Sequence, residues 1–187
     1  EYLTENTDIT VIYPYEELMQ EKTSLNADIY YKTDTHWNNV GAYIGATELL
    51  KALDVKMPSL FEDLIITSEP KMAGDLAGMI NLREQIGYVD TQYSITGYEY
   101  NNVKNIEQDF SNMVSYESDS LDSRSILVLR DSYCTAMFNY IAPQFRHSWF
   151  RHASTYSYDD LVENDPDIVV FETVERYVYQ LGTFKLQ

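Results

Sequence analysis

Two runs of consecutive apolar residues constrain the fold of this chain more than any other feature. SILVL spans residues 125–129 and DIVVFE spans residues 167–172, and neither run alternates apolar with polar side chains. A strand without a polar face is buried on both sides, as in a parallel sheet covered by helices. Helix-like segments separate these runs from a third strand-like run, HSWF at residues 147–150. The pattern therefore predicts an α/β fold with a parallel sheet flanked by helices.

The N-terminal half adds shorter elements. Residues 8–14 (DITVIYP) have a β-branched centre and a proline stop, which predicts another short buried strand. Apolar residues at three- and four-residue spacing predict a helix over residues 39–53. Either Thr35 or Asn38 could cap its start. Residues 74–82 (GDLAGMINL) predict a short helix that begins at Gly74 and Asp75.

Residues 85–122 are harder to assign. Tyrosines stand there among Thr, Ser, Asn and Gly, with loose alternation, so we expect short antiparallel strands or a small irregular β insertion. No internal repeat or low-complexity linker separates this region from the rest. We therefore expect one domain over residues 1–187, a length that buries roughly two-thirds of the unfolded surface.

Composition narrows the choice of partners. The formal net charge is −17, from 13 Lys and Arg against 30 Asp and Glu, so the surface repels phosphate backbones. Nucleic acid is therefore excluded as an expected partner. Cys134 is the single cysteine, which excludes an intramolecular disulfide and an all-cysteine metal site. No run of eighteen apolar residues exists, so we expect no membrane span within this chain.

Two short segments carry the residue types of a serine nucleophile site. Asp34 and His36 are two residues apart, and on an extended backbone such side chains project to the same side. Serine becomes a nucleophile when a base takes its proton, and histidine needs a carboxylate to fix its tautomer. Ser132 follows the buried strand, where open α/β folds place their ligands. The backbone N–H groups of Ser132 and Tyr133 would face a developing oxyanion.

Each half of this site also has a structural explanation. Asp34 could cap a turn, His36 could be an ordinary surface residue, and Ser132 could be only a helix N-cap. The two halves gain weight together, because both fall where a strand passes into a helix. A metal site from His36, His147, His152 and Asp34 is arithmetically possible. No H-x-x-x-H or short Cys/His spacing supports one, so we expect neither metal nor cofactor.

A family resemblance covers four blocks of the chain. YYKTDTHWNNVGAY at residues 30–43 resembles the signature of the DHHW and AlgX/AlgJ-like proteins. They are a branch of the SGNH hydrolase superfamily linked to acetylation of exopolysaccharides such as alginate. GDLAGM (74–79), LRDSYC (129–134) and DIVVFETVERYV (167–178) resemble further family blocks in the same order. The resemblance implies an SGNH-like fold with a circularly permuted motif order, because the D-x-H pair precedes the serine.

The same resemblance implies a function. Ser132 would be the nucleophile, His36 the base and Asp34 its orienting partner in O-acetylation of a cell-surface or extracellular polysaccharide. An integral-membrane acyltransferase would supply the acetyl group. The oxyanion donors are not placed by the motifs; Tyr133, Arg151 and Arg130 are the candidates for oxyanion or substrate contacts. The chain opens at Glu1 without Met or a signal peptide, so we expect a fragment of a longer secreted or membrane-anchored protein.

The sequence is also compatible with two other functions. A carbohydrate acetylesterase would use the same three residues, since transfer and hydrolysis share the acyl-enzyme. A non-catalytic glycan-binding module is an alternative of another class, because a fold does not guarantee activity. Seventeen tyrosines would suit such a module, since tyrosine offers a flat apolar face with a polar tip.

Overall fold

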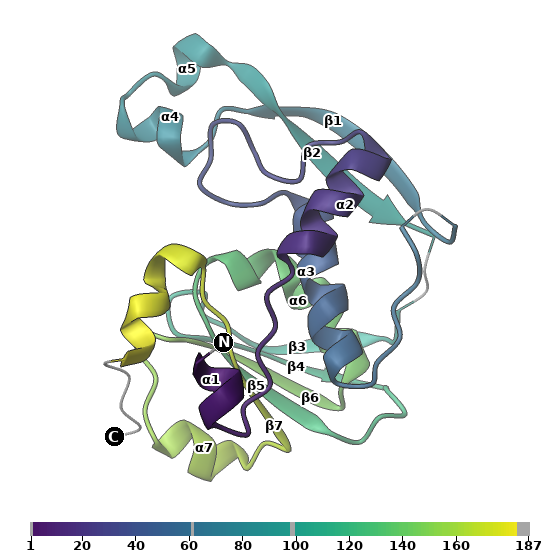
Figure 1. Ribbon diagram of the computed structural model, residues 1–187, viewed down its shortest axis with the longest axis vertical. Helices are drawn as coiled ribbons and strands as arrows, with labels where there is room; N and C mark the ends of the chain where they lie inside the picture. The colour runs from purple at the N-terminus through teal and green to yellow at the C-terminus, as the bar shows by residue number, and fades with distance from the viewer. Residues whose placement is uncertain (1, 61, 98–99, 183–187) are drawn as a thin grey trace. The chain divides into compact units, whose positions relative to one another are not determined.

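The structure, a computed structural model, describes residues 2–60, 62–97 and 100–182 (Figure 1). The chain divides into two compact units, unit 1 over residues 1–98 and unit 2 over residues 99–187. A domain can contain more than one compact unit, so the single domain expected over residues 1–187 stays a prediction.

Unit 1 combines helices with a two-stranded antiparallel sheet. Its elements are α1 (Tyr2–Asn6), α2 (Tyr15–Leu25), α3 (Asn39–Ala52), β1 (Ile65–Met72), α4 (Asp75–Met79), α5 (Arg83–Ile86) and β2 (Tyr88–Thr96). Helix α3 supplies much of the core and packs against α2 and β2. The Asn38 side chain caps it by accepting hydrogen bonds from Val40 N at 2.9 Å and Gly41 N at 3.2 Å. The predicted helix and its Asn38 cap are confirmed.

Unit 2 is built on a five-stranded mixed sheet in the order β3-β4-β6-β5-β7 (Figure 1). Its elements are β3 (Val103–Gln108), β4 (Met113–Ser118), β5 (Ser125–Arg130), η1 (Tyr133–Met137), α6 (Phe138–Ile141), η2 (Ala142–Gln144), β6 (His147–His152), α7 (Asp159–Asn164), β7 (Ile168–Phe171) and η3 (Glu175–Gly182), where η denotes a 3-10 helix. Strand β5 is parallel to both β6 and β7, and all six of its residues are buried. The α/β fold expected from its unbroken apolar run is confirmed.

The sheet is mixed because β4 pairs antiparallel with β6, and β3 pairs antiparallel with β4. These two strands and β2 account for the β structure expected within residues 85–122. Strand β3 is exposed along its whole length. An exposed strand needs no run of apolar side chains, so the sequence carries no clear strand signal there. The circular permutation of the motif order stays a prediction.

The strand predicted over residues 8–14 is wrong. The segment is irregular, and no described strand pairs with it. Ile9 is 59% exposed and Tyr13 is 63% exposed. A β-branched run needs a neighbouring strand for its N–H and C=O groups before it becomes a strand. The helix predicted after Ser132 also differs, because its first turns, η1, are 3-10 helix.

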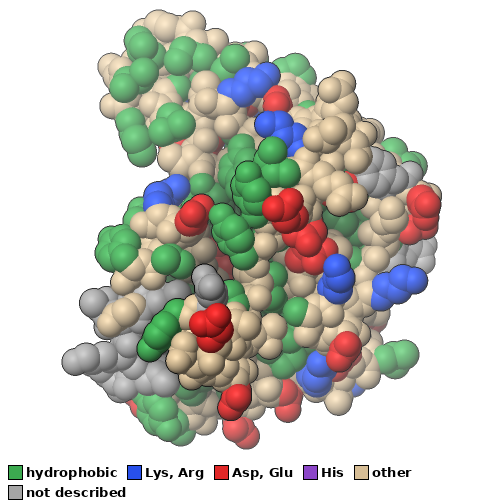
Figure 2. Space-filling view, in the orientation of Figure 1, with side chains coloured by type: hydrophobic (Ala, Val, Ile, Leu, Met, Phe, Trp, Pro, Cys, Tyr) green, Lys and Arg blue, Asp and Glu red, His purple; other side chains and the backbone are tan. Residues whose placement is uncertain are grey.

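An apolar surface covers the α4–α5 end of unit 1, where Figure 2 shows hydrophobic side chains gathered at the upper left. Its exposed members are Leu76, Met79, Ile80, Leu82, Ile86 and Tyr88. The backbone N–H of Leu76 donates to Thr33 O at 3.0 Å, so this surface borders the segment that carries Asp34 and His36. Within the described ranges, no helix combines the length and apolar character needed to cross a membrane.

Candidate active site

The Asp34 and His36 side chains contact one another directly. His36 Nδ1 lies 2.7 Å from Asp34 Oδ1, and the His36 backbone N–H donates to the same oxygen at 3.1 Å. The histidine side chain is 31% exposed and the aspartate 14%. A carboxylate on Nδ1 holds the ring proton there and leaves Nε2 as the basic nitrogen. The pair therefore has the arrangement that a histidine base requires.

Two further carboxylates hold the segment that carries this pair. Asp90, which is buried on β2, accepts hydrogen bonds from Lys32 N at 2.5 Å, Thr33 N at 3.2 Å and Thr33 Oγ1. Asp75, the first residue of α4, accepts from Thr35 N at 2.7 Å and Thr35 Oγ1 at 2.6 Å. Each carboxylate takes both the N–H and the hydroxyl of one threonine, so residues 32–35 are fixed from two sides.

Asp75 titrates below the ordinary range for an aspartate. Burial alone acts to raise its pKa, but hydrogen bonds from the Thr35 hydroxyl and N–H, the Leu76 N–H and the nearby His36 ring together lower the pKa below 3.8. A depressed pKa means that this carboxylate stabilises the fold above its unfolded pKa, and that the contribution is lost as pH falls through the folded value. Asp75 therefore remains an acceptor for Thr35 at neutral pH.

Gly74 is required beside Asp34 for reasons of space. A Cβ placed on Gly74 would clash with the Asp34 side chain, with Cγ at 2.7 Å. The backbone there has φ −87°, which any residue can adopt, so the constraint is steric and not conformational. The glycine allows α4 to approach the Asp34 carboxylate, and Asp75 N donates to Asp34 Oδ2 at 3.4 Å.

Asp34, His36 and Asp75 also form the group in the described part of the chain that best resembles a metal site. One ligand atom from each lies within 4.8 Å of the others. These atoms already make hydrogen bonds: His36 Nδ1 with Asp34 Oδ1, and both Asp75 oxygens with Thr35. Hydrogen bonding accounts for the cluster, and the donor set does not require an ion.

Ser132 lies in unit 2, at the carboxyl end of β5. It is exposed, has φ −70° and ψ −20°, and stands directly before η1. Strands β6 and β7 run parallel to β5, so the carboxyl ends of all three strands meet at this edge. A ligand at this edge of the sheet can therefore reach the Ser132 hydroxyl.

Asp131 ties the turn that carries Ser132 to the residues that follow β7. Asp131 N donates to Glu172 Oε2 at 3.1 Å, and Tyr133 N donates to Asp131 Oδ1 at 2.7 Å. Asp131 Oδ2 accepts from Val174 N at 2.8 Å. The Tyr133 N–H that we expected at an oxyanion is thus bonded to Asp131, and its oxyanion role stays a prediction.

The two arginines predicted to contact substrate or oxyanion bind other groups of unit 2. Arg130 is 2% exposed and donates to Phe110 O at 2.7 Å and to Asp131 O at 3.4 Å. Arg151 pairs with Asp160 at 2.6 Å and donates to the Asn112 side chain. Substrate contacts by either arginine stay predictions. Arg176, by contrast, lies at the Ser132 end, where its Nη1 donates to the Tyr133 hydroxyl at 3.3 Å.

Cys134 is not a rival nucleophile. It is fully buried two residues after Ser132, and burial raises the pKa of its thiol well above the ordinary value. The thiolate form that would react is therefore suppressed.

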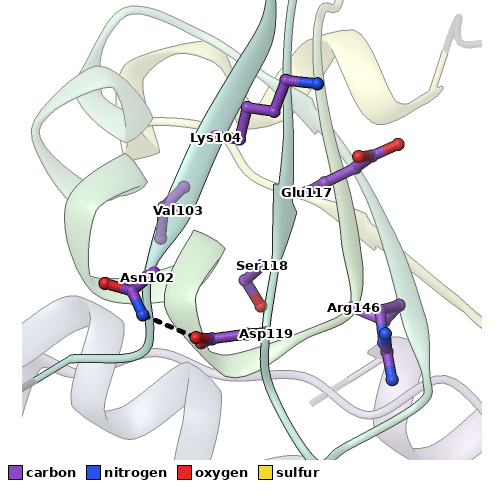
Figure 3. Close-up of a pocket in the computed structure, with 7 residues that line it drawn as sticks. All are labelled: Asn102, Val103, Lys104, Glu117, Ser118, Asp119 and Arg146. Carbon is purple, nitrogen blue, oxygen red and sulfur yellow. Dashed lines mark hydrogen bonds between the residues drawn. The ribbon is translucent and has the colours of Figure 1, made fainter.

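A hollow of about 370 Å³ lies elsewhere in unit 2 (Figure 3). Its lining residues are Asn102, Val103, Lys104, Glu117, Ser118, Asp119 and Arg146. Arg146 precedes β6, whereas Ser132 follows the parallel strand β5, so the two lie at opposite ends of the sheet. The hollow is therefore separate from the Ser132 site.

Three carboxyl groups that hold the site, Asp75, Asp90 and Glu172, were not predicted from the sequence. Asp75 and Asp90 lie 41 and 56 residues after Asp34 in the sequence, and Glu172 lies 40 residues after Ser132. The block GDLAGM carries Asp75 and the block DIVVFETVERYV carries Glu172, which was a signal that both regions matter. Asp90 stands in a tyrosine-rich strand with no comparable signal.

Comparisons with known proteins agree with the fold. A sequence model of the family described as "SGNH hydrolase-like domain, acetyltransferase AlgX" matches residues 7–113, more than half of the chain. A search of curated protein sequences finds no match. A DHHW family protein from Eubacterium siraeum is similar in structure, with 17% identity and a TM-score of 0.70. The match covers 90% of this chain and 65% of that protein.

PatB1 from Bacillus cereus is also similar, with 18% identity and a TM-score of 0.66 over 91% of this chain and 71% of PatB1. PatB1 with a sulfonyl adduct gives a TM-score of 0.66 at 17% identity, over 91% of this chain and 70% of that chain. At such identities these likenesses concern the fold. The match of the family model goes further, and the chain belongs to the SGNH hydrolase-like domain family of acetyltransferase AlgX.

Proposed function

We propose that this chain is the catalytic domain of a serine O-acetyltransferase that modifies a polysaccharide, with Ser132 as nucleophile, His36 as base and Asp34 as its orienting partner. The observation that carries the proposal is the 2.7 Å contact between His36 Nδ1 and Asp34 Oδ1. Membership of an acetyltransferase family and the exposed Ser132 at the end of β5 support it. The proposal requires that Ser132 and His36 meet in the working protein.

The reaction proceeds in two balanced steps. Ser132 Oγ attacks the carbonyl carbon of the acetyl donor, while His36 Nε2 takes the hydroxyl proton. Asp34 stabilises the imidazolium that forms, through Nδ1. His36 then returns the proton to the leaving group, and acetyl-serine remains. In the second step a sugar hydroxyl gives its proton to His36 and attacks the acetyl carbonyl. The bond between Ser132 Oγ and the acetyl carbon breaks, and His36 returns the proton to Ser132 Oγ.

Hydrolysis is the second candidate function, and the exposure of Ser132 favours it. Water that reaches acetyl-serine would release acetate by the same acid–base steps, so the chain would be a carbohydrate acetylesterase. The partners are also part of the proposal: a polysaccharide acceptor, and an acetyl group supplied by an integral-membrane acyltransferase. With such partners, the protein would act outside the cell or at its surface.

Covalent labelling tests the proposal. Incubation with 4-nitrophenyl acetate, followed by peptide mass spectrometry, is expected to place one acetyl group on Ser132. Adding an oligosaccharide should then move acetyl to the sugar if the protein is a transferase, and should leave free acetate if it is an esterase. Binding of sugar with no acetyl-serine and no ester turnover would instead support the glycan-binding module.

Two variants make the labelling specific. Ser132→Ala should remove the acetyl group from the mapped peptides. Ser154→Ala is the matched control, because Ser154 is exposed and its Oγ lies 2.7 Å from His152 Nδ1, so it is another serine in contact with a histidine. Acetylation that survives Ser132→Ala and disappears in Ser154→Ala would reject Ser132 as the nucleophile.

Gly74→Ala tests the steric support of Asp34. The added Cβ must displace the Asp34 carboxylate, because it would lie 2.7 Å from Cγ. We expect the rate of acetyl-serine formation to fall by about tenfold or more, with a free energy of unfolding lower by about 1–3 kcal/mol. Gly182→Ala is the control, since a Cβ at Gly182 meets no atom of the described residues within 4 Å. Equal rates for wild type and Gly74→Ala would show that Asp34 needs no such fixed position.

A further inference from the structure

Ser132 is flanked by a pair of carboxyl groups that the two-step reaction does not use. Asp131 precedes it in the chain, and Glu172 directly follows β7, the strand beside β5 (Figure 1). Glu172 N donates to Leu129 O at 2.8 Å, which extends the β5–β7 pairing to this residue. The Glu172 carboxyl group is thereby brought to the turn that carries Ser132.

The hydrogen bonds assign different protonation states to the two groups. Both oxygens of Asp131 accept backbone N–H groups, from Tyr133 at 2.7 Å and from Val174 at 2.8 Å, as an ionised carboxylate does. Glu172 accepts the Asp131 N–H at 3.1 Å, which places its carboxyl group against Asp131. Two neighbouring carboxylates repel, and one proton held between them removes that repulsion. Both Asp131 oxygens already accept N–H groups, so Glu172 is the group left to hold the proton.

We propose that Glu172 and Asp131 share one proton, and that this pair positions the Ser132 nucleophile. Glu172 holds the peptide N–H before Ser132, and Asp131 holds the one after it. The two bonds together fix the backbone on both sides of Ser132. The positioning role, though not the shared proton, rests on the proposed function.

The surroundings agree with a protonated Glu172. Burial of the carboxyl group, and then the charge of Asp131, raises the pKa of Glu172 from 4.5 to about 8. The other groups that interact with it are the Arg130 guanidinium, which favours the ionised form, and the buried Cys134 thiol. If Glu172 loses its proton, two adjacent carboxylates repel, and the hold on the Ser132 turn weakens.

The first test follows the backbone itself and needs no activity. Amide chemical shifts of Asp131 and Tyr133 in the wild-type protein are measured by NMR between pH 6 and 10. We expect both to titrate with a midpoint near pH 8, the value to which the pKa of Glu172 is raised. Glu172→Gln should abolish the titration, because its amide donates to Asp131 and accepts from the Asp131 N–H at every pH. Flat shifts in the wild-type protein would overturn the shared proton.

The second test measures the rate of acetyl-serine formation across the same range. Loss of one proton with a pKa near 8 lowers the wild-type rate by about fivefold between pH 8 and pH 9. Glu172→Ala should be slow throughout the range. Glu172→Gln should restore most of the rate that Glu172→Ala loses at pH 7, and should show no decline above pH 8. Glu163→Gln, an exposed glutamate of α7, is the matched control and should behave as wild type.

The two tests separate the failures. A titrating backbone with the same alkaline decline in wild type and Glu172→Gln overturns the positioning role. Absence of acetyl-serine in every protein rejects the proposed function, and with it the positioning of a nucleophile, while the NMR titration still decides the shared proton.

Discussion

His36→Ala is expected to lower the rate of acetyl-serine formation by about 10⁴- to 10⁶-fold, the range found when the histidine of a serine triad is removed. The physical reason is that Ser132 loses the group that takes its proton, and a serine hydroxyl is a poor nucleophile without a base. Stopped-flow or discontinuous assays with 4-nitrophenyl acetate measure this rate. The fold should survive, since the His36 side chain is already 31% exposed.

His147→Ala is the matched control for this variant. His147 also lies near a carboxylate, with Nδ1 3.9 Å from Glu117 Oε1, and its side chain is 43% exposed. It stands on β6 at the end away from Ser132, so its removal should leave the rate unchanged. A rate that falls equally in both variants would assign the loss to general destabilisation and not to a missing base.

Asp34→Asn is expected to lower the same rate by about 10³- to 10⁴-fold while leaving the backbone intact. Asp34 Oδ1 accepts from His36 Nδ1, whereas the amide of asparagine can donate to that nitrogen and move the ring proton to Nε2. The nitrogen that should take the serine proton would then already hold one. The ¹⁵N shifts of the His36 ring report this change of tautomer directly.

Asp28→Asn serves as the control, because Asp28 is a neighbouring carboxylate with a 44% exposed side chain and an ion pair to Lys32 at 3.3 Å. It should keep the wild-type rate and tautomer. An Asp34→Asn protein with full activity would show that His36 is oriented without Asp34.

The parts of the site that depend on local spacing could be predicted from the sequence. The two-residue interval between Asp34 and His36 was enough to expect their contact, and Asn38 stood where a helix cap was needed. The unbroken apolar run SILVL predicted the buried strand β5, and its end located Ser132 at the carboxyl edge of the sheet.

The parts of the site that depend on contacts between residues far apart in the sequence could not be predicted. Asp90 looks like an ordinary polar residue of a half-exposed strand until β2 brings it to Thr33. Glu172 ends an apolar run, and only the parallel pairing of β5 with β7 places it against Asp131. The strand predicted over residues 8–14 is wrong for a related reason, because strand propensity does not supply a partner strand.

Reaction with a sulfonyl fluoride decides whether Ser132 and His36 work as one site. Such a reagent modifies a serine rapidly only when a base activates it. Peptide mass spectrometry after a timed exposure should show the sulfonyl group on Ser132 of the wild-type protein. His36→Ala should label at least about 10³-fold more slowly, while Ser154→Ala keeps the wild-type rate. Equal labelling of Ser132 in wild type and His36→Ala would contradict the proposed triad.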